Sequence, residues 1–378
     1  MKIVLAPDKF KGCLSSPKVS SIMKQAFQDV LPDAEIVSVP LADGGEGTVD
    51  AIVSALGGEK LKVRVTGPLG KYVEAEFGLC NSGKSAVMEM ASASGMALLA
   101  KEELNPLLAS SYGTGELIRA AIHVGVEEIT LGIGGSATVD GGAGMAQALG
   151  YRLLDENGHD LPPGAGALDK LASIDASGVD RRLFQIRINA ACDVTNPLIG
   201  PNGAAAVYAP QKGATPEMVG RLEANLKKLS DLWIRNRMLD TVTRPGDGAA
   251  GGLGCGLRAF CRAGLSPGAA LVMKAVRFRE KLFDADLVVT GEGRTDAQTE
   301  SGKLCSEVAR VAHEEGVPVL LLSGALSGEL ERFNGIFDFA FSIASGRPSL
   351  EEAIASAPED IRFTVLNVAR LMKKGFHP

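Results

Sequence analysis

Five short apolar runs, each followed by a polar loop, most constrain the fold of this 378-residue chain. They comprise residues 2–6, 35–39, 287–290, 317–323 and 339–343. Continuous apolar runs of this length are typical of parallel strands that are covered on both faces. Helix-like segments follow these runs, the first with Ser16 as its predicted N-cap, which indicates strands joined by helical crossovers. The pattern predicts an α/β fold with a flavodoxin-like five-stranded parallel sheet in the order 2-1-3-4-5.

A long segment with a different pattern separates the first two runs from the last three. Its first part, residues 62–90, holds stretches of alternating apolar and polar side chains joined by glycine-containing turns, as in an antiparallel meander. The chain is also longer than a single hydrophobic core usually organises. We therefore expect two α/β domains. Residues 1–60 with 284–378 form the flavodoxin-like domain, and residues 61–283 form an inserted mixed-sheet domain that carries glycine-rich loops.

Composition and charge argue against several classes of protein. The net charge is −6 and the sequence has no basic cluster, which disfavours binding to nucleic acid. No stretch approaches the roughly 20 apolar residues of a membrane span, and the N-terminus lacks a signal-peptide pattern. The six cysteines and four histidines are scattered, without the spacing of a zinc site or a disulfide framework. These features predict a cytoplasmic protein that acts neither on nucleic acid nor at a membrane.

The densest glycine loop lies in residues 131–150, LGIGGSATVDGGAGMAQALG, between a predicted strand and a predicted helix. Backbone N–H groups of glycines can approach an anion closely, so a loop of this kind before a helix can bind phosphate. Asp140 lies within the loop, and a carboxylate beside a phosphate site suggests a metal-bridged anion. The loop residues expected to bind a cofactor are Gly134, Gly135, Ser136, Asp140, Gly141 and Gly142.

Charged residues follow the predicted strands at the edge where open α/β sheets bind their ligands. In the predicted strand order, Asp8 should face Glu292 across one crevice. The inserted domain would bring the glycine loop and Asp193 to the same crevice. The other charged residues expected there are Lys9, Lys11, Asp43, Arg294, Asp296 and Lys303.

These residue types favour phosphoryl transfer over the other common chemistries. Carboxylate oxygens suit Mg²⁺, and glycine loops with Lys or Arg suit phosphates. The sequence shows no histidine or cysteine arrangement for a catalytic triad. Phosphoryl transfer requires mainly positioning and charge neutralisation, with a carboxylate to accept the proton of the acceptor hydroxyl. The sequence therefore indicates an Mg²⁺-dependent kinase that uses ATP on a small molecule, without identifying the acceptor.

Three further glycine motifs have competing explanations. Residues 78–85, GLCNSGKS, match the Walker A pattern, but the strand-like residues that follow favour a hairpin turn. Residues 132–137, GIGGSA, match a dinucleotide fingerprint with Asp155 about 20 residues further on, but VDGGAG intervenes before the helix. A nicotinamide-dependent oxidoreductase of a small hydroxy acid therefore remains an alternative, as does a non-catalytic sugar-acid sensor. Residues 246–256 form either a second phosphate site or a close helix-packing site.

Eight segments resemble the bacterial glycerate kinase family. They are APDKFKGCLSS at 6–16, PLADGGEGT at 40–48, SYGTGELI at 111–118, IGGSATVDGGAG at 133–144, ACDVTNPLIGPNGAA at 191–205, PQKGA at 210–214, AAGGLG at 249–254 and TGEGRTD at 290–296. The resemblance runs through nearly the whole chain. It implies ATP-dependent phosphorylation of D-glycerate to 2-phosphoglycerate in sugar-acid or glyoxylate-derived metabolism, on a two-domain α/β architecture. Lys9-Phe10-Lys11 departs from the family pattern, where many members carry Ser before the aromatic residue.

Residue roles under this hypothesis follow from side-chain chemistry. The expected catalytic residues are Asp193, Lys11 and Asp296. The expected substrate ligands are Asp8, Ser16, Asp43, Asn196 and Arg294. The expected Mg²⁺ ligands are Asp43, Asp193 and Glu292, and Lys303 is expected to bind ATP with the glycine loop. The expected partner is D-glycerate, and the oligomeric state stays open, with a homodimer among the possibilities.

Overall fold

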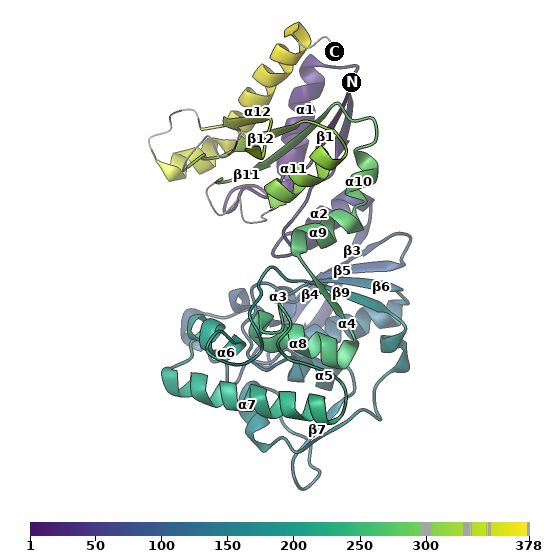
Figure 1. Cartoon of the computed structure of the whole chain (residues 1–378), viewed down its shortest axis with the longest axis vertical. Helices are drawn as coiled ribbons and strands as arrows, with labels where there is room; N and C mark the ends of the chain where they lie inside the picture. Colours follow the sequence, from purple (N-terminus) through teal and green to yellow (C-terminus); the bar gives the residue numbers. More distant parts are fainter. Residues whose placement is uncertain (296–303, 328–332, 334, 345, 347–348, 376–378) are drawn as a thin grey trace. The chain divides into compact units, whose positions relative to one another are not determined.

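The structure is a computed structural model that describes residues 1–295, 304–327, 333, 335–344, 346 and 349–375 (Figure 1). The chain divides into two compact units. Unit 1 comprises Met1–Asp43, Asp50–Gly57 and Val272–Pro378, and unit 2 comprises Gly44–Val49 and Gly58–Leu271. These limits differ from those of the predicted domains, because residues 44–49 pack with unit 2 and residues 272–283 pack with unit 1.

Unit 1 contains a parallel sheet of five strands. They are β1 (Lys2–Leu5), β2 (Glu35–Ser38), β11 (Leu287–Glu292), β12 (Val319–Ser323) and β13 (Phe339–Ser342). The order across the sheet is β13-β12-β11-β1-β2. Numbered along the chain, this is the predicted order 2-1-3-4-5, which is confirmed. In the register of the central strand, Ile3 lies opposite Leu287 on one side and Ile36 on the other.

Helices connect these strands. They are α1 (Ser16–Val30), α2 (Thr48–Leu56), α9 (Gly268–Ala275), α10 (Phe278–Lys281), α11 (Leu304–Glu314) and α12 (Leu350–Gly375), of which α2 and α9 begin in unit 2. Helices α1 and α12 lie side by side, and Met23 and Val365 join Ile3 and Val289 of the sheet in one core (Figure 1). The predicted N-cap is wrong by one residue, because the cap is Ser15 and makes no side-chain cap hydrogen bond.

Unit 2 contains a mixed sheet of six strands. They are β3 (Glu59–Thr66), β4 (Tyr72–Cys80), β5 (Ser85–Glu89), β6 (Glu128–Gly132), β9 (Arg187–Ala191) and β10 (Gly264–Ser266). The order is β10-β9-β6-β5-β4-β3; β3, β4 and β5 pair antiparallel, and the pairs from β5 to β10 are parallel. Two short strands, β7 (Arg152–Leu154) and β8 (Ser173–Asp175), pair separately. The predicted mixed sheet is thus present.

Helices and short 3-10 turns surround the mixed sheet. The helices are α3 (Ala91–Ser94), α4 (Tyr112–Val124), α5 (Ala143–Ala148), α6 (Ala204–Tyr208), α7 (Pro216–Arg235) and α8 (Ala249–Cys261). The 3-10 turns are η1 (Met96–Leu98), η2 (Lys101–Glu103), η3 (Ala165–Lys170), η4 (Arg181–Phe184) and η5 (Pro210–Lys212). Among the described residues of either unit, no helix has the length and apolar character that a membrane span requires.

The Walker A match at residues 78–85 is a β-hairpin. Strands β4 and β5 pair antiparallel, with Cys80 opposite Ser85. Asn81, Ser82 and Gly83 between them all have positive φ, as in a tight turn. Because Ser85 begins a strand, Lys84 and Ser85 do not open a helix as they would in a phosphate-binding P-loop. The predicted hairpin is confirmed.

Candidate functional site

The carboxyl ends of β1 and β11 bring two acidic residues of unit 1 together. Asp8 follows β1, and its backbone N–H donates to the carbonyl oxygen of Gly291 at 2.8 Å. Glu292 is the last residue of β11, the parallel neighbour of β1. The two side chains interact electrostatically, as do those of Asp8 and Asp43. This edge is the switch point of the sheet, where open α/β folds bind their ligands.

The pKa of Asp8 shows the electrostatic effect of this acidic edge. Burial of its side chain, followed by repulsion from Asp43, raises its pKa from 3.8 to about 7. A hydrogen bond from the N–H of Lys9 and the Lys9 charge lower the pKa, and Glu292 raises it. The carboxylates of Asp43 and Glu292 thus lie close enough to Asp8 to oppose its ionisation. A bound cation would remove this repulsion, which makes the edge a candidate cation site.

Glu292 is held in place by neighbouring hydroxyl groups. Its side chain is 9% exposed, and its Oε1 accepts a hydrogen bond from the Thr295 hydroxyl at 3.0 Å. The same Thr295 hydroxyl lies 2.9 Å from the hydroxyl of Ser323, at the end of β12. The carboxylate is therefore oriented before any ligand arrives.

The raised pKa of Asp8 makes stability depend on pH. Ionisation of Asp8 is disfavoured in the folded protein, so the folded state loses stability as the pH rises from 3.8 to about 7. We expect Asp8→Asn to unfold at a higher temperature than the wild type at pH 8 in EDTA, and this advantage should shrink toward pH 4. Thermal melts across this range measure it, with the exposed Asp33→Asn as control. A variant less stable than wild type at pH 8 would contradict the assignment.

The other predicted site residues of unit 1 differ in their exposure to solvent. Lys11 and Arg294 are exposed, and a Cβ placed on Gly293 would be 3.3 Å from the backbone nitrogen of Lys11, so the two loops adjoin. Ser16 is 4% exposed and its hydroxyl donates to the carbonyl oxygen of Pro7 at 2.7 Å. Ser16 therefore ties the loop after β1 to α1, and its predicted substrate contact stays a prediction. Asp296 and Lys303 lie outside the described residues.

Unit 2 has a second candidate ligand edge, by which we mean the carboxyl ends of the parallel strands in a sheet. In unit 2 these are the ends of its four parallel strands. Glu89, the last residue of β5, accepts hydrogen bonds from the N–H groups of Gly47 and Val49, both at 3.0 Å. A Cβ on Gly132, at the end of β6, would be 2.4 Å from the carbonyl oxygen of Gly44. Residues 44–49 therefore pack directly on these strand ends. Glu89 is not among the residues predicted from the sequence, where its only signal is an acidic residue at the end of an apolar strand.

Asp193 belongs to this edge, two residues beyond the end of β9. Its side chain is exposed, and its Oδ1 accepts a hydrogen bond from the N–H of Gly268, at the start of α9, at 2.7 Å. Asn196 lies further along the same loop, where its Oδ1 accepts from the Tyr208 hydroxyl and its Nδ2 donates to the Asn202 carbonyl oxygen. Asp193 is thus presented to ligands. Asn196 shapes the loop, and its predicted substrate contact stays a prediction.

The glycine loop after β6 presents unused backbone donors. Gly134 and Gly135 are exposed, and Gly135 has a φ of +75°. From the other side, the carbonyl oxygen of Gly135 accepts from the N–H of Met96, and the N–H of Ala137 donates to Ser94. Within the described residues, no hydrogen bond uses the N–H of Gly134, Gly135 or Ser136. Consecutive unpaired N–H groups in a turn with positive φ form an anion-binding concavity.

The second half of this loop is turned inward. Asp140 is fully buried, and its carboxylate accepts hydrogen bonds from the N–H and hydroxyl of Ser111 and from the N–H groups of Gly142 and Gly144. The N–H of Gly141 donates to the carbonyl oxygen of Gly251. These hydrogen bonds give Asp140, Gly141 and Gly142 a structural role, and the predicted cofactor contact of these three residues stays a prediction. Their hydrogen-bonding groups hold the loop together from within.

The second glycine-dense loop, residues 246–256, is a packing site. Ala250, Gly251 and Gly252 adopt left-handed backbone angles near the start of α8. A Cβ on Gly251 would be 2.0 Å from the carbonyl oxygen of Thr138, so only glycine fits there. Of the two explanations left open by the sequence, the structure supports close packing against the first glycine loop.

Lys212, which ends η5, is a residue of this region that the sequence analysis did not select. Its side chain is 2% exposed, and its Nζ donates to the Ser136 hydroxyl at 2.5 Å and to the carbonyl oxygen of Thr138 at 2.7 Å. Burial lowers its pKa from 10.5 to about 7, and Asp140 opposes this shift. The segment PQKGA, counted above only as a family resemblance, thus places a cation under the glycine loop.

The dinucleotide match at residues 132–137 lacks its structural context. The helix after the glycines begins only at Ala143. Asp155 follows β7, which belongs to the separate two-stranded sheet, and its carboxylate accepts from the N–H groups of Asn157 and His159. A ribose-binding carboxylate would follow the next strand of the same parallel sheet. The geometry therefore does not support the nicotinamide alternative.

Neither unit contains a preformed metal cage among its described residues, where no group of three or more His, Cys, Asp or Glu side chains is arranged to hold a metal ion. Mg²⁺ in kinase sites is usually bound by one or two carboxylates together with substrate phosphates. The mutually repelling carboxylates of Asp8, Asp43 and Glu292 supply oxygen ligands of that kind. The donor set therefore fits Mg²⁺ that arrives with a nucleotide.

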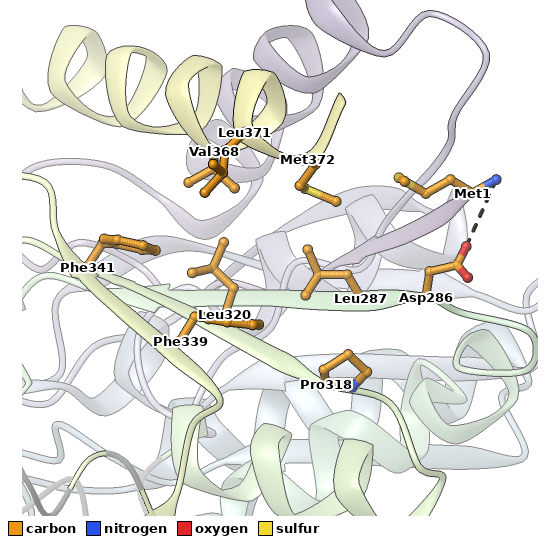
Figure 2. A pocket seen from close by; sticks show the side chains of 10 residues that line it. All are labelled: Met1, Asp286, Leu287, Pro318, Leu320, Phe339, Phe341, Val368, Leu371 and Met372. Carbon is orange, nitrogen blue, oxygen red and sulfur yellow. Dashed lines mark ion pairs between the residues drawn. The ribbon is translucent and has the colours of Figure 1, made fainter. Parts of the chain in front are cut away.

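An apolar cavity of about 430 Å³ lies elsewhere in unit 1 (Figure 2). Leu287 and Leu320 from the sheet and Leu371 and Met372 from α12 line it. It adjoins the amino ends of the strands, at the opposite edge of the sheet from Asp8. The polar groups drawn in Figure 2 are the N-terminus and the carboxylate of Asp286, which pair at 3.9 Å. This cavity lacks the convergent polar groups of a catalytic site.

Comparisons with known proteins show what this chain is similar to. The family model described as "Glycerate kinase family" matches residues 3–373. The chain is 48% identical to a glycerate kinase of Halalkalibacterium halodurans over 368 residues, 97% of each chain. It is 44% identical to the glycerate 2-kinase of Escherichia coli strain K12 over 99% of each chain. A crystal structure of a candidate glycerate kinase 2 from Salmonella typhimurium LT2 matches with a TM-score of 0.92 at 48% identity, over 99% of each chain.

Proposed function

The chain belongs to the glycerate kinase family, and on this premise we propose that it transfers the γ-phosphoryl group of ATP to the 2-hydroxyl of D-glycerate. The products are 2-phosphoglycerate and ADP, and the reaction serves sugar-acid or glyoxylate-derived carbon metabolism. The name of the Escherichia coli relative, glycerate 2-kinase, supports the choice of hydroxyl. The family membership supports an alcohol acceptor and a nucleotide donor.

The acidic edge of unit 1 is the observation that carries this proposal. Burial of the Asp8 side chain, together with repulsion from Asp43 and Glu292, raises the pKa of Asp8 to about 7. Such a cluster repels a free carboxylic acid but attracts a divalent cation with its nucleotide. Mg²⁺, when bound, neutralises charge on the nucleotide phosphates. A kinase therefore explains the cluster better than a sugar-acid sensor does.

The remaining residues take roles that their positions permit. Asp193, exposed and oriented by Gly268, is proposed to accept the proton of the glycerate hydroxyl or to bind Mg²⁺. Lys11 and Arg294 are exposed cations suited to the glycerate carboxylate or the γ-phosphate. The Gly134–Ser136 turn is proposed to hold phosphate oxygens. Asp296 and Lys303 keep their proposed catalytic and nucleotide-binding roles, and closure of both ligand edges around one crevice stays a prediction.

One coupled assay tests both the reaction and the position of transfer. Protein, ATP, MgCl₂ and D-glycerate are mixed with enolase but without phosphoglycerate mutase, and phosphoenolpyruvate is followed by absorbance. We expect phosphoenolpyruvate to form at once, because enolase accepts only the 2-phosphate. Because enolase itself requires Mg²⁺, the loss of activity expected in EDTA is measured as ADP formation without enolase, and omission of glycerate serves as the control.

Three other results, one from this assay and two from binding measurements, would each indicate a different function. Phosphoenolpyruvate that appears only after mutase is added would show transfer to the 3-hydroxyl. Glycerate-dependent closure of the protein without ADP formation would favour a sensor. NADH fluorescence enhancement on binding, with no ADP formed, would favour the oxidoreductase. Any of these results would contradict the proposed function.

A further inference from the structure

A buried ammonium group lies directly beneath the exposed glycine turn of unit 2. The Lys212 side chain is 2% exposed, and its Nζ contacts the Ser136 hydroxyl and the Thr138 carbonyl oxygen. On the opposite side, Gly135 and Ala137 pair with the backbone of Ser94–Met96. The turn is thus fixed from both sides, while the N–H groups of Gly134, Gly135 and Ser136 take part in no hydrogen bond among the described residues.

The charge of Lys212 has no contacting carboxylate. Within the described residues, no ion pair joins Lys212 to an acidic side chain. Asp140 influences it electrostatically, but the Asp140 carboxylate is already bonded to Ser111, Gly142 and Gly144. A buried cation without a contacting anion is costly, and an anion arriving nearby offsets that cost. In a site shielded from water, such an attraction is stronger than at the surface.

We propose that Lys212 is a positioning residue whose ammonium form, stabilised when an anion binds, lies under the Gly134–Ser136 turn and makes this turn the binding site for the nucleotide phosphates. The identity of the anion rests on the proposed kinase function. The backbone N–H groups supply the direct contacts, and Lys212 acts through Ser136 and Thr138 without touching the ligand. A simple cross-link between η5 and the loop would also hold the turn, but it would not depend on the charge.

The charge dependence provides a distinguishing signature. Burial lowers the pKa of Lys212 to about 7, so at pH 8.5 the free protein holds it largely neutral. A phosphate bound above it favours the ammonium form, so binding should take up a proton. Asp140 is the charged group that acts on Lys212 among the described residues, and it stays bonded within the loop. Asp8, with a pKa of about 7, is already ionised at pH 8.5 and contributes little.

Calorimetry of Mg-ADP binding at pH 8.5, in two buffers of different ionisation enthalpy, measures the proton uptake of the full-length protein. For the wild type we expect an uptake that approaches about one proton per site. Lys212→Met keeps the length of the side chain without its charge, and it should weaken Mg-ADP binding about tenfold or more and remove the uptake. The KM for ATP should rise similarly, while the KM for D-glycerate stays within about twofold. Lys227→Met, on the exposed face of α7, is the matched control.

A folded Lys212→Met protein with wild-type affinity for Mg-ADP would overturn the inference. If that variant fails to fold, the wild-type calorimetry decides alone, and an absence of proton uptake overturns it. Failure of the proposed function gives a different result. Mg-ADP binding that depends on Lys212, without any 2-phosphoglycerate formed, would reject the glycerate kinase reaction and leave the role of Lys212 intact. Normal 2-phosphoglycerate formation with an unchanged KM for ATP in Lys212→Met would reject only the role of Lys212.

Discussion

Replacing Asp193 with asparagine is expected to lower kcat for 2-phosphoglycerate formation by about 10²–10⁴-fold, the range typical for loss of a general base. Asparagine keeps the size of the side chain and an oxygen that can still accept from the Gly268 N–H. The variant should therefore fold normally, and its melting temperature should stay within about 2 °C of wild type, as for an exposed substitution. Steady-state kinetics with the enolase-coupled assay measures the effect.

The dependence on Mg²⁺ separates the two roles proposed for Asp193. If the carboxylate binds the metal, raising the Mg²⁺ concentration should restore part of the activity of Asp193→Asn. If the carboxylate is the proton acceptor, added Mg²⁺ should leave the loss unchanged. Asp231→Asn, on the exposed face of α7, is the control and should retain full activity. Turnover of Asp193→Asn within about fivefold of wild type would remove Asp193 from the mechanism, because a positioned base contributes at least about 10²-fold.

The second large effect concerns stability. Arg258→Met should lower the free energy of unfolding of unit 2 by about 3–5 kcal/mol, because it leaves a buried carboxylate without its counter-ion. Asp247 is fully buried and Arg258 is 8% exposed, with a distance of 2.5 Å between Arg258 Nη1 and Asp247 Oδ1. The Asp247 carboxylate also accepts a hydrogen bond from the backbone N–H of Arg244 at Oδ2 and interacts with the thiol of Cys255. This pair anchors the segment before α8 that packs on the glycine loop.

Urea unfolding followed by tryptophan fluorescence measures this change within unit 2, because Trp233 is the single tryptophan of the chain and is fully buried in α7. The double variant Asp247→Asn/Arg258→Met should recover much of the loss, since no unpaired charge stays buried. Arg244→Met is the matched control, because its partner Asp240 is exposed, and such surface pairs contribute about 1 kcal/mol or less. Equal effects of Arg258→Met and Arg244→Met would contradict this account.

The first ligand edge could be predicted because it depends on local patterns and on strand order. Short apolar runs identified the five strands of unit 1, and the crossover rule fixed their order. That order placed Asp8 beside Glu292, and the structure has them at the ends of adjacent strands. The hairpin at residues 78–85 was also decided locally, by the strand-like residues after its turn.

The ligand edge of unit 2 shows what sequence patterns could not predict. Within a single glycine loop, Gly134 and Gly135 face solvent whereas Asp140 is fully buried, and no sequence pattern distinguishes these two parts of the loop. Which N–H groups remain available depends on partners such as Ser111 and Gly251, which lie far away in the chain. The sequence could therefore locate an anion-binding loop without identifying its working residues.

By itself, the amino-acid sequence determined the five strands of unit 1 and their order, the glycine loop after β6 and the resemblance to the glycerate kinase family. Only the tertiary structure decided that Asp8 titrates near neutral pH, that Asp140 is structural and that Lys212 lies beneath the glycine turn. The physical reason is that periodicity and turn chemistry act between near neighbours in the chain. Burial and charge interactions are instead set by residues that meet only when the chain has folded.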